Sequence, residues 1–203
     1  MKKIVGFLSL FLIPSLAFGQ VKLKEKAPLA DVKMKNVQGG ELSLNDAKKE
    51  KGLIVVFSCN TCPFVVGTPD FPGWERQYNE LDELATKNNI GFVLVNSNEA
   101  KRDGADSFDA MVEHAKETKY TMPYIVDVNS QLANALKATS TPHIYMFNAD
   151  MELVYVGSID NIWDSKRKSD EPYLKNAIQT LGEGKKIKTA NTAAKGCSIK
   201  RKM

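Results

Sequence analysis

The sequence predicts an α/β domain in which helices flank a mixed central sheet and a β-hairpin comes first. Three observations carry this prediction. The apolar runs 53–57 and 90–95 have the composition of strands that are covered on both faces. Segments with helical spacing alternate with them, which implies parallel strands joined by right-handed crossovers. Residues 141–159 carry an Asn-Ala-Asp turn between two apolar segments, so an antiparallel hairpin is expected to complete the sheet.

The N-terminal β-hairpin is predicted from apolar and polar residues that alternate around Gly39-Gly40. Asn45 is then expected to cap a short helical turn that ends near Gly52. The apolar positions of the two arms are Val32, Met34, Leu42 and Leu44.

Four later segments have the apolar spacing of helices. They are residues 73–89, 105–120, 130–138 and 171–184. Residues 122–127 are expected to form a short strand between the second and the third helix. Ser130 is expected to cap the third helix, and Gly182 to lie at the C-cap of the last.

The first residues have the pattern of a secretory signal peptide. Lys2 and Lys3 provide a positive start, residues 4–16 an apolar core, and Ala17 and Gly19 the small residues near a cleavage point. The alternative is an uncleaved membrane anchor. The apolar segment is short for a span of roughly 20 residues, and a proline interrupts it, so cleavage is the favoured interpretation.

The chain of 203 residues suits one domain with appendages. We expect a signal peptide over 1–19, one domain over 20–183 and a basic tail over 184–203. The mature protein is then exported, periplasmic or secreted, with no stable membrane insertion. The net charge of +4 is too small to indicate a nucleic-acid partner.

Cys59 and Cys62 form a C-x-x-C pair where the apolar strand 53–57 meets a helix. Free N–H groups and the dipole at a helix start stabilise a thiolate and lower the pKa of a cysteine from about 8.5 to between roughly 3.5 and 7.5. Cys59 precedes the helix, so it is expected to be the nucleophile. Cys62 lies one turn later, is expected to be more covered, and would resolve the mixed disulfide.

Two structural interpretations of the cysteines compete with a redox site. Cys59, Cys62 and Cys197 could bind zinc together with His114 or His143, although paired half-sites are missing. Alternatively, Cys59 and Cys62 could form a static disulfide, as exported proteins often do. A bridge that closes so small a loop restrains the unfolded chain little, which makes stability a weak reason for it.

Three segments together resemble one protein family. "FSCNTCPFV", "STPHIYMFNADMELVYVGSIDN" and "GCSIK" are similar to the peroxiredoxin-like branch of the thioredoxin superfamily, also described as redoxin or alkyl hydroperoxide reductase/thiol-specific antioxidant related. The resemblance extends over about residues 27–200. It implies a thioredoxin-like fold in which Pro142 is cis and faces the dithiol. It also implies a thiol–disulfide oxidoreductase without a bound cofactor, acting on protein or small-molecule thiols and disulfides.

The sequence departs from the family pattern at two points. A peroxidase site needs Thr or Ser three residues before its cysteine and a proline further upstream, whereas this chain has Val56 and Gly52. Thiol-dependent peroxidase activity and a non-catalytic binding module with a structural disulfide therefore stay open as alternatives. The strand before the dithiol also lacks the acidic residue that shuttles protons in thioredoxin, so Glu75 or solvent would have to act in its place.

The basic tail contains the third cysteine, Cys197. A free cysteine needs an explanation in an oxidising compartment, and Ile199 offers an apolar anchor. We therefore expect the tail to pack back on the domain and to bring Cys197 near the dithiol. Cys197 would then be an accessory thiol that links to Cys59.

Overall fold

The computed structural model describes residues 22–202. The signal peptide predicted for residues 1–19 lies outside them. No helix between residues 22 and 202 combines the length and the apolar character needed to cross a membrane.

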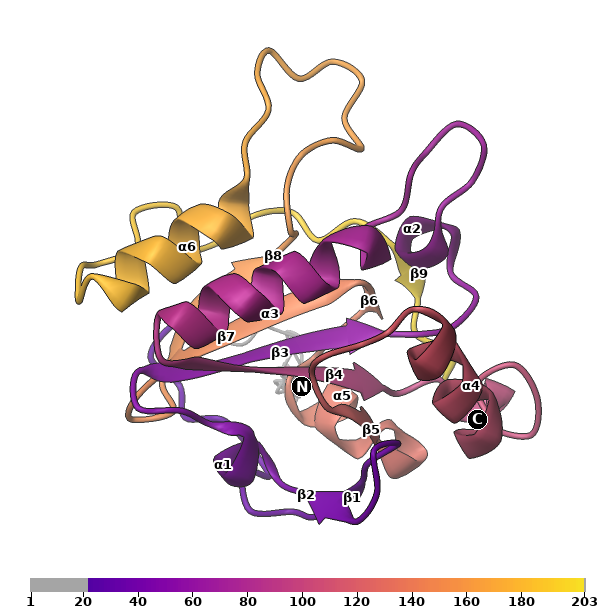
Figure 1. Ribbon diagram of the computed structural model, residues 1–203. Coiled ribbons are helices and arrows are strands. Elements are labelled where there is room, and N and C mark those ends of the chain that lie inside the picture. The colour runs from indigo at the N-terminus through magenta and orange to yellow at the C-terminus, as the bar shows by residue number, and fades with distance from the viewer. Residues whose placement is uncertain (1–21, 203) are drawn as a thin grey trace, which may run out of the picture.

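A five-stranded sheet forms the centre of the molecule. Its strands are β3 (Gly52–Ser58), β4 (Ile90–Asn96), β5 (Tyr124–Val126), β7 (His143–Asn148) and β8 (Leu153–Gly157). Their order across the sheet is β5-β4-β3-β7-β8 (Figure 1). β3, β4 and β5 are parallel, whereas β7 and β8 pair antiparallel to their neighbours. This is the mixed sheet that the sequence predicts.

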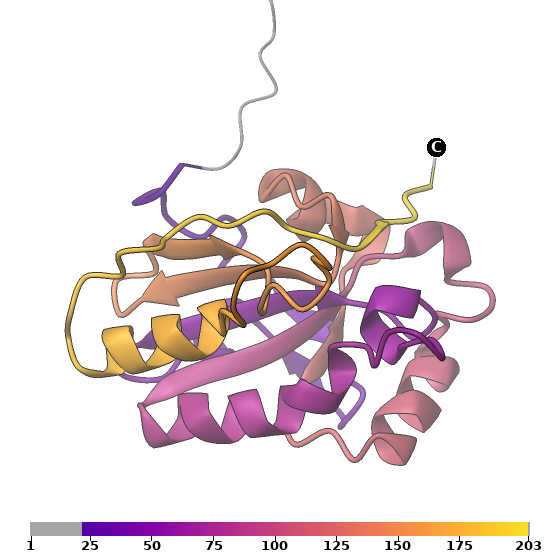
Figure 2. The same ribbon diagram turned by 90° about the horizontal axis from the view of Figure 1, so that it is seen from above.

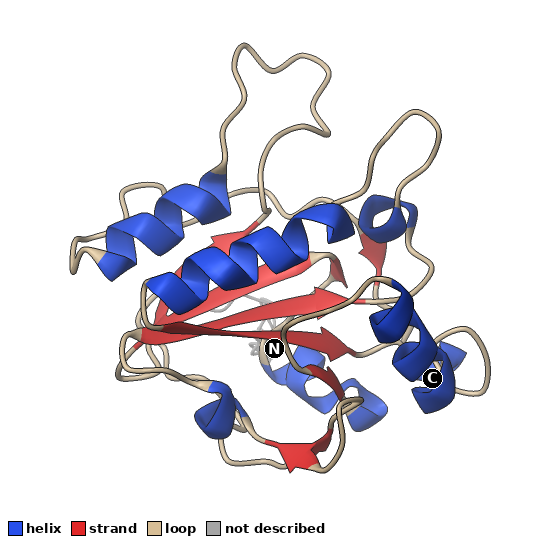
Figure 3. Ribbon diagram, viewed as in Figure 1, coloured by secondary structure: helices blue, strands red, loops and turns tan. Residues whose placement is uncertain are grey.

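Six helices surround this sheet in the described part of the chain. They are α1 (Leu44–Ala47), α2 (Pro63–Val66), α3 (Tyr78–Lys87), α4 (Phe108–Glu117), α5 (Gln131–Ala135) and α6 (Tyr173–Gly182). Short 3-10 turns η1 (Glu75–Gln77), η2 (Glu99–Lys101) and η3 (Val128–Ser130) precede or connect some of them. Figure 3 shows α3 and α6 on one side of the sheet and α5 on the other.

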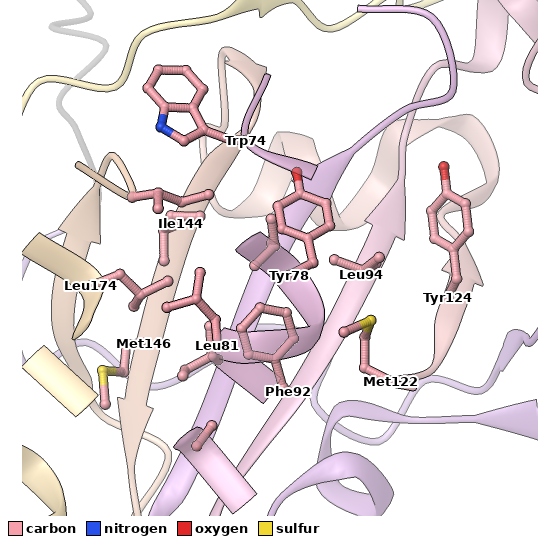
Figure 4. Close-up of a cluster of buried hydrophobic side chains, with 14 of the residues drawn as sticks. Trp74, Tyr78, Leu81, Phe92, Leu94, Met122, Tyr124, Ile144, Met146 and Leu174 are labelled. Carbon is pink, nitrogen blue, oxygen red and sulfur yellow. The ribbon is translucent and has the colours of Figure 1, made fainter. Parts of the chain in front are cut away.

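The continuous apolar run in β3 is explained by burial on both faces, because all seven of its residues are buried. Ile54 and Val56 belong to the cluster that includes side chains of α3 and α6. Figure 4 shows part of this cluster around Tyr78 and Leu81. On the other face, Phe57 and its alternate neighbours in β3 pack with side chains of α1 and α5.

The N-terminal hairpin is present but smaller than predicted. Strands β1 (Met34–Lys35) and β2 (Glu41–Leu42) pair antiparallel around Gly39 and Gly40, which both have positive φ. Leu44 does not extend the second arm, because it is the first residue of α1.

Three predicted helix caps need correction. Ser43, not Asn45, caps α1, and it forms a capping box with Asp46. Ser130 occupies the N-cap position of α5 but makes no capping hydrogen bond. The carboxylate of Asp127 accepts the first free N–H groups of that helix instead. Gly182 is the last residue of α6 rather than its cap, and Glu183 follows at the C-cap.

The C-terminal tail returns across the molecule. After α6 it first runs beside β8, where the N–H of Thr192 donates to the carbonyl of Val156 at 3.0 Å. It then reaches β9 (Cys197–Ser198), which pairs antiparallel with β6 (Ser140–Thr141). Figure 2 shows the tail as a yellow trace from α6 to β9. The tail packs on the domain, as the sequence led us to expect.

Candidate redox site

The predicted site residues meet at one edge of the sheet. The carboxyl ends of β3 and β4 lie side by side there, with Ser58 paired to Asn96. β7 is antiparallel and begins at the same edge, where His143 pairs with Phe57. Because Cys59 follows β3 directly and Pro142 directly precedes β7, the fold brings these two residues together from distant parts of the chain.

The C-x-x-C segment leads into the one-turn helix α2. Cys62 is its N-cap and Pro63 its first residue, a position where the missing N–H of proline costs nothing. Cys59, Cys62 and Cys197 are all free thiols. Cys59 is 2% exposed and Cys62 4%, so the expectation that Cys62 is the more covered thiol is wrong. Both are covered because the residue before Pro142 and the tail pack against them.

Thr141 contacts both sulfurs of the pair. Its Oγ1 lies 3.2 Å from Sγ of Cys59, and Sγ of Cys62, in its protonated form, donates to its carbonyl oxygen at 3.1 Å. The following peptide bond, Thr141–Pro142, is cis, as the resemblance implied. Sequence reasoning selected Pro142 but did not identify Thr141, which makes the closest contacts.

Cys197 lies beside the dithiol. Its backbone pairs with Thr141 in the β6–β9 ladder. Cys59, Cys62, Thr141 and Cys197 line one hollow of about 140 Å³, together with Lys101 and Lys200. The structure thus brings the third thiol, Cys197, to the same hollow as the dithiol.

The pKa values of the two thiols of the pair are shifted in opposite directions. The pKa of Cys62 is lowered to about 5, first by the Cys59 thiol and then, against burial, by the thiol and the backbone N–H of Cys197. The pKa of Cys59 is raised by the neighbouring Cys62 and by burial. This reverses the order expected from the helix dipole. α2 begins after Cys62 rather than directly after Cys59, and it is only one turn long.

A buried carboxylate, Asp106, lies close to Cys59. It is fully buried and accepts three hydrogen bonds, from the backbone N–H of Asn60 at 3.0 Å and the amides of Asn96 at 2.8 Å and Asn98 at 3.0 Å. The negative charge of Asp106 also raises the pKa of Cys59, after the larger effects of Cys62 and of burial. Asp106 is thus a buried carboxylate near the dithiol that comes from the segment after β4 rather than from β3.

Glu75, the candidate proton shuttle, has other partners. Its carboxylate accepts a hydrogen bond from the hydroxyl of Tyr120 at 2.7 Å and contacts Nε2 of His114. His143 is buried on β7, and burial lowers its pKa to about 4.

Within residues 22–202, no three His, Cys, Asp or Glu side chains are arranged to hold a metal ion. The zinc set weighed as an alternative from the sequence is therefore not assembled there.

Comparison with known proteins identifies the family. The Redoxin family model matches residues 22–178, most of the described chain. The chain belongs to the Redoxin family. The comparison with curated proteins finds no match.

Solved structures support the thioredoxin-like fold of this redoxin. An uncharacterized conserved protein from Geobacillus kaustophilus is 32% identical with a TM-score of 0.73, and the match covers 89% of this chain and 93% of that one. A hypothetical protein from Sinorhizobium meliloti is 26% identical with a TM-score of 0.75, over 91% and 97% of the two chains. A putative protein disulfide isomerase from Bacteroides thetaiotaomicron, 15% identical over 83% and 91% with a TM-score of 0.55, shares the fold.

Sequence reasoning missed several polar residues at the redoxin site. Asp106 lies 46 positions from Asn60, so no local spacing connects them. A usable signal was the polar Asn-Ser-Asn segment at residues 96–98, directly after a buried strand. Polar residues at the carboxyl end of a parallel strand often line a site, because such ends meet at one edge of the sheet.

Proposed function

We propose that this redoxin is an exported thiol–disulfide oxidoreductase that works through Cys59 and Cys62. The main support is that both sulfurs lie within 3.2 Å of atoms of Thr141, the residue before cis-Pro142. A pair held in this way can open and close a disulfide with little movement of the backbone. The lowered pKa of Cys62 supplies one thiolate at neutral pH.

The exchange proceeds in two balanced steps. A thiolate of the pair attacks one sulfur of a partner disulfide, and the other partner sulfur leaves as a thiolate and takes up a proton. The second thiol of the pair then loses its proton and attacks the mixed disulfide. The partner leaves as a dithiol, and the Cys59–Cys62 disulfide forms. Reversing these steps oxidises a partner dithiol.

Insulin reduction in the presence of dithiothreitol tests this function. The wild-type chain should accelerate precipitation of the reduced insulin chains, and the double variant Cys59→Ser/Cys62→Ser should not. A Gly104→Ala variant is the control and should keep the wild-type activity, because a Cβ there meets no atom within 4 Å and the pair stays intact. Turnover of hydrogen peroxide by the wild type, with no insulin activity, would favour a peroxidase instead. Inactivity in both assays would favour a binding module.

Export is supported by the sequence of the first residues. Expression of the full chain with fractionation of the cells should recover the protein outside the cytoplasm. Mass spectrometry should show a mature chain that begins near Gln20. Recovery of an intact N-terminus in the cytoplasm would contradict this part of the proposal.

A further inference from the structure

The edge of β6 beside the dithiol is occupied by the protein's own tail. Thr141 pairs with Cys197 and Ser140 with Ser198, antiparallel, directly before Pro142. The N–H of Ile199 also donates to the carbonyl of Thr139 at 3.1 Å. Strand β9 therefore lies next to the sulfurs and uses the backbone groups that an incoming peptide strand could otherwise use.

Several contacts hold the tail in this position. Ile199 is buried within the core cluster that includes α5. The N–H of Lys200 donates to Oδ1 of Asn98 at 2.8 Å, and its carbonyl accepts the N–H of Ala100 at 2.8 Å. These contacts bind the tail to the loop after β4 as well as to β6. Cys197 is thus positioned on a fixed strand rather than on a free end.

Gly196 allows the tail to approach this closely. A Cβ atom at this position would lie 2.2 Å from the carbonyl oxygen of Thr141, closer than any real contact. Any side chain here would push β9 away from β6. The glycine therefore belongs to the geometry that places Cys197.

We propose that Cys197 is a third redox thiol, whose partner in disulfide exchange is Cys62. The inference rests on the proposed oxidoreductase function and extends it. It also differs from the sequence-based expectation of a link to Cys59. Cys62 and Cys197 line the same hollow, and both contact Thr141, Cys62 through its thiol and Cys197 through the strand pairing. The thiol and the N–H of Cys197 lower the pKa of Cys62, and the Cys62 thiol raises the pKa of Cys197 in turn.

The exchange needs no external oxidant. Once the Cys59–Cys62 disulfide has formed, Cys197 loses its proton and attacks Sγ of Cys62. The Cys62–Cys197 bond forms as the Cys59–Cys62 bond breaks, and Cys59 leaves as a thiolate that takes up the proton. One disulfide replaces another, so the number of electrons is unchanged. The product has a free Cys59 and a tail that is covalently fixed over the β6 edge.

The electrostatics of the site favour this step in the oxidised protein. In the reduced protein, burial and the Cys62 thiol raise the pKa of Cys197 to about 11, which keeps it protonated. Disulfide formation removes the negative charge of Cys62 and with it part of this effect. Lys200, whose charge favours the Cys197 thiolate, lines the same hollow.

Disulfide mapping in two matched variants tests the partner choice. A Cys59→Ser chain treated with diamide, a two-electron thiol oxidant, should form an intramolecular Cys62–Cys197 bridge in the monomer. A Cys62→Ser chain retains Cys59 and Cys197, and it should form at least about tenfold less bridge, because Cys197 influences the pKa of Cys62 and not that of Cys59. An equal yield from both variants, or bridges only between molecules in the first, would overturn the proposal.

A backbone variant tests the role of the tail strand without altering a sulfur. Gly196→Ala in the Cys59→Ser chain should slow bridge formation by about tenfold, because the effective concentration of Cys197 falls. Gly104→Ala is the control, since a Cβ there meets no atom within 4 Å. Equal rates in the two variants would overturn the role assigned to β9.

The insulin and bridge experiments distinguish a failure of the oxidoreductase function from a failure of the third-thiol inference. Insulin reduction by the wild type without a Cys62–Cys197 bridge in the Cys59→Ser chain would overturn the third-thiol inference and leave the oxidoreductase function intact. Formation of the bridge by a chain that does not reduce insulin would overturn the proposed function while supporting the contact between Cys62 and Cys197.

Discussion

Thr141 and Cys197 face each other across the two-stranded β6–β9 sheet. The same threonine contacts Sγ of Cys59 through its hydroxyl and Sγ of Cys62 through its carbonyl. One residue thereby holds all three cysteines of the chain around it. The reactivity of each thiol then depends on its neighbours more than on its order in the sequence.

Cys62 should be the first thiol to react with iodoacetamide in the reduced protein. Its pKa is lowered to about 5, so its thiolate should be formed above about pH 5 and protonated below it. Peptide mass spectrometry after brief labelling at a series of pH values would give the titration curve. Cys197, with its pKa raised to about 11, should label slowly at neutral pH. Earlier labelling of Cys59 would show that this order is wrong.

Asp106→Asn should make Cys59 easier to ionise. The substitution removes a buried negative charge that raises the pKa of Cys59, so its alkylation should become faster at a given pH. It should also lower the free energy of unfolding by about 1–3 kcal/mol, because an amide cannot accept all three hydrogen bonds. Labelling rates and urea unfolding measure the two effects. Glu75→Gln is the control and should leave Cys59 labelling unchanged.

His143 should make the protein less stable in mild acid. Burial lowers its pKa from 6.5 to about 4. Its neutral form therefore contributes stability in full above about pH 6.5, and this contribution is lost as the pH falls from there to about 4. The full loss is about 3 kcal/mol. Urea unfolding gives the free energy of unfolding at each pH. The slope of this free energy against pH should differ between the wild type and His143→Asn over this range. Parallel pH profiles would count against the prediction.

Asp160→Ala should destabilise the fold without changing thiol chemistry. The buried carboxylate accepts hydrogen bonds from Nε1 of Trp74 at 2.7 Å and from Nε2 of Gln77 at 2.8 Å. Its removal leaves the indole N–H without this partner, at a cost of about 1–3 kcal/mol. Thermal unfolding should show the loss, while the pH profile of Cys62 labelling should be unchanged. A shifted labelling profile would instead connect Asp160 to the site.

The arrangement of the sheet could be predicted because its signals are local. The run 53–57 must be buried on both faces, and the segments around it have helical or turn spacing that short windows of sequence show. Helix caps were less predictable, because several polar residues compete for the same N–H groups. Asp127 reaches the start of α5 from four residues ahead of Gln131, so the serine at the N-cap position is not needed.

Part of the site could also be predicted from local signals in the sequence. The C-x-x-C pair and Pro142 carry recognisable motifs, and the tail contained an apolar anchor, Ile199. The contacts of Asp106 and the burial of Cys59 depend on segments that meet only in the folded chain. The relative acidity of the thiols depends on those contacts, and spacing alone does not determine it.

The position of β9 also has a consequence for the order of events during synthesis. A ribosome makes the chain from its N-terminus, so the strand that covers the dithiol emerges after the five strands of the central sheet. Until then the edge of β6 has no partner and the sulfurs of Cys59 and Cys62 lack their cover. A chain truncated before Cys197 should therefore be oxidised at Cys59 and Cys62 more readily than the full chain.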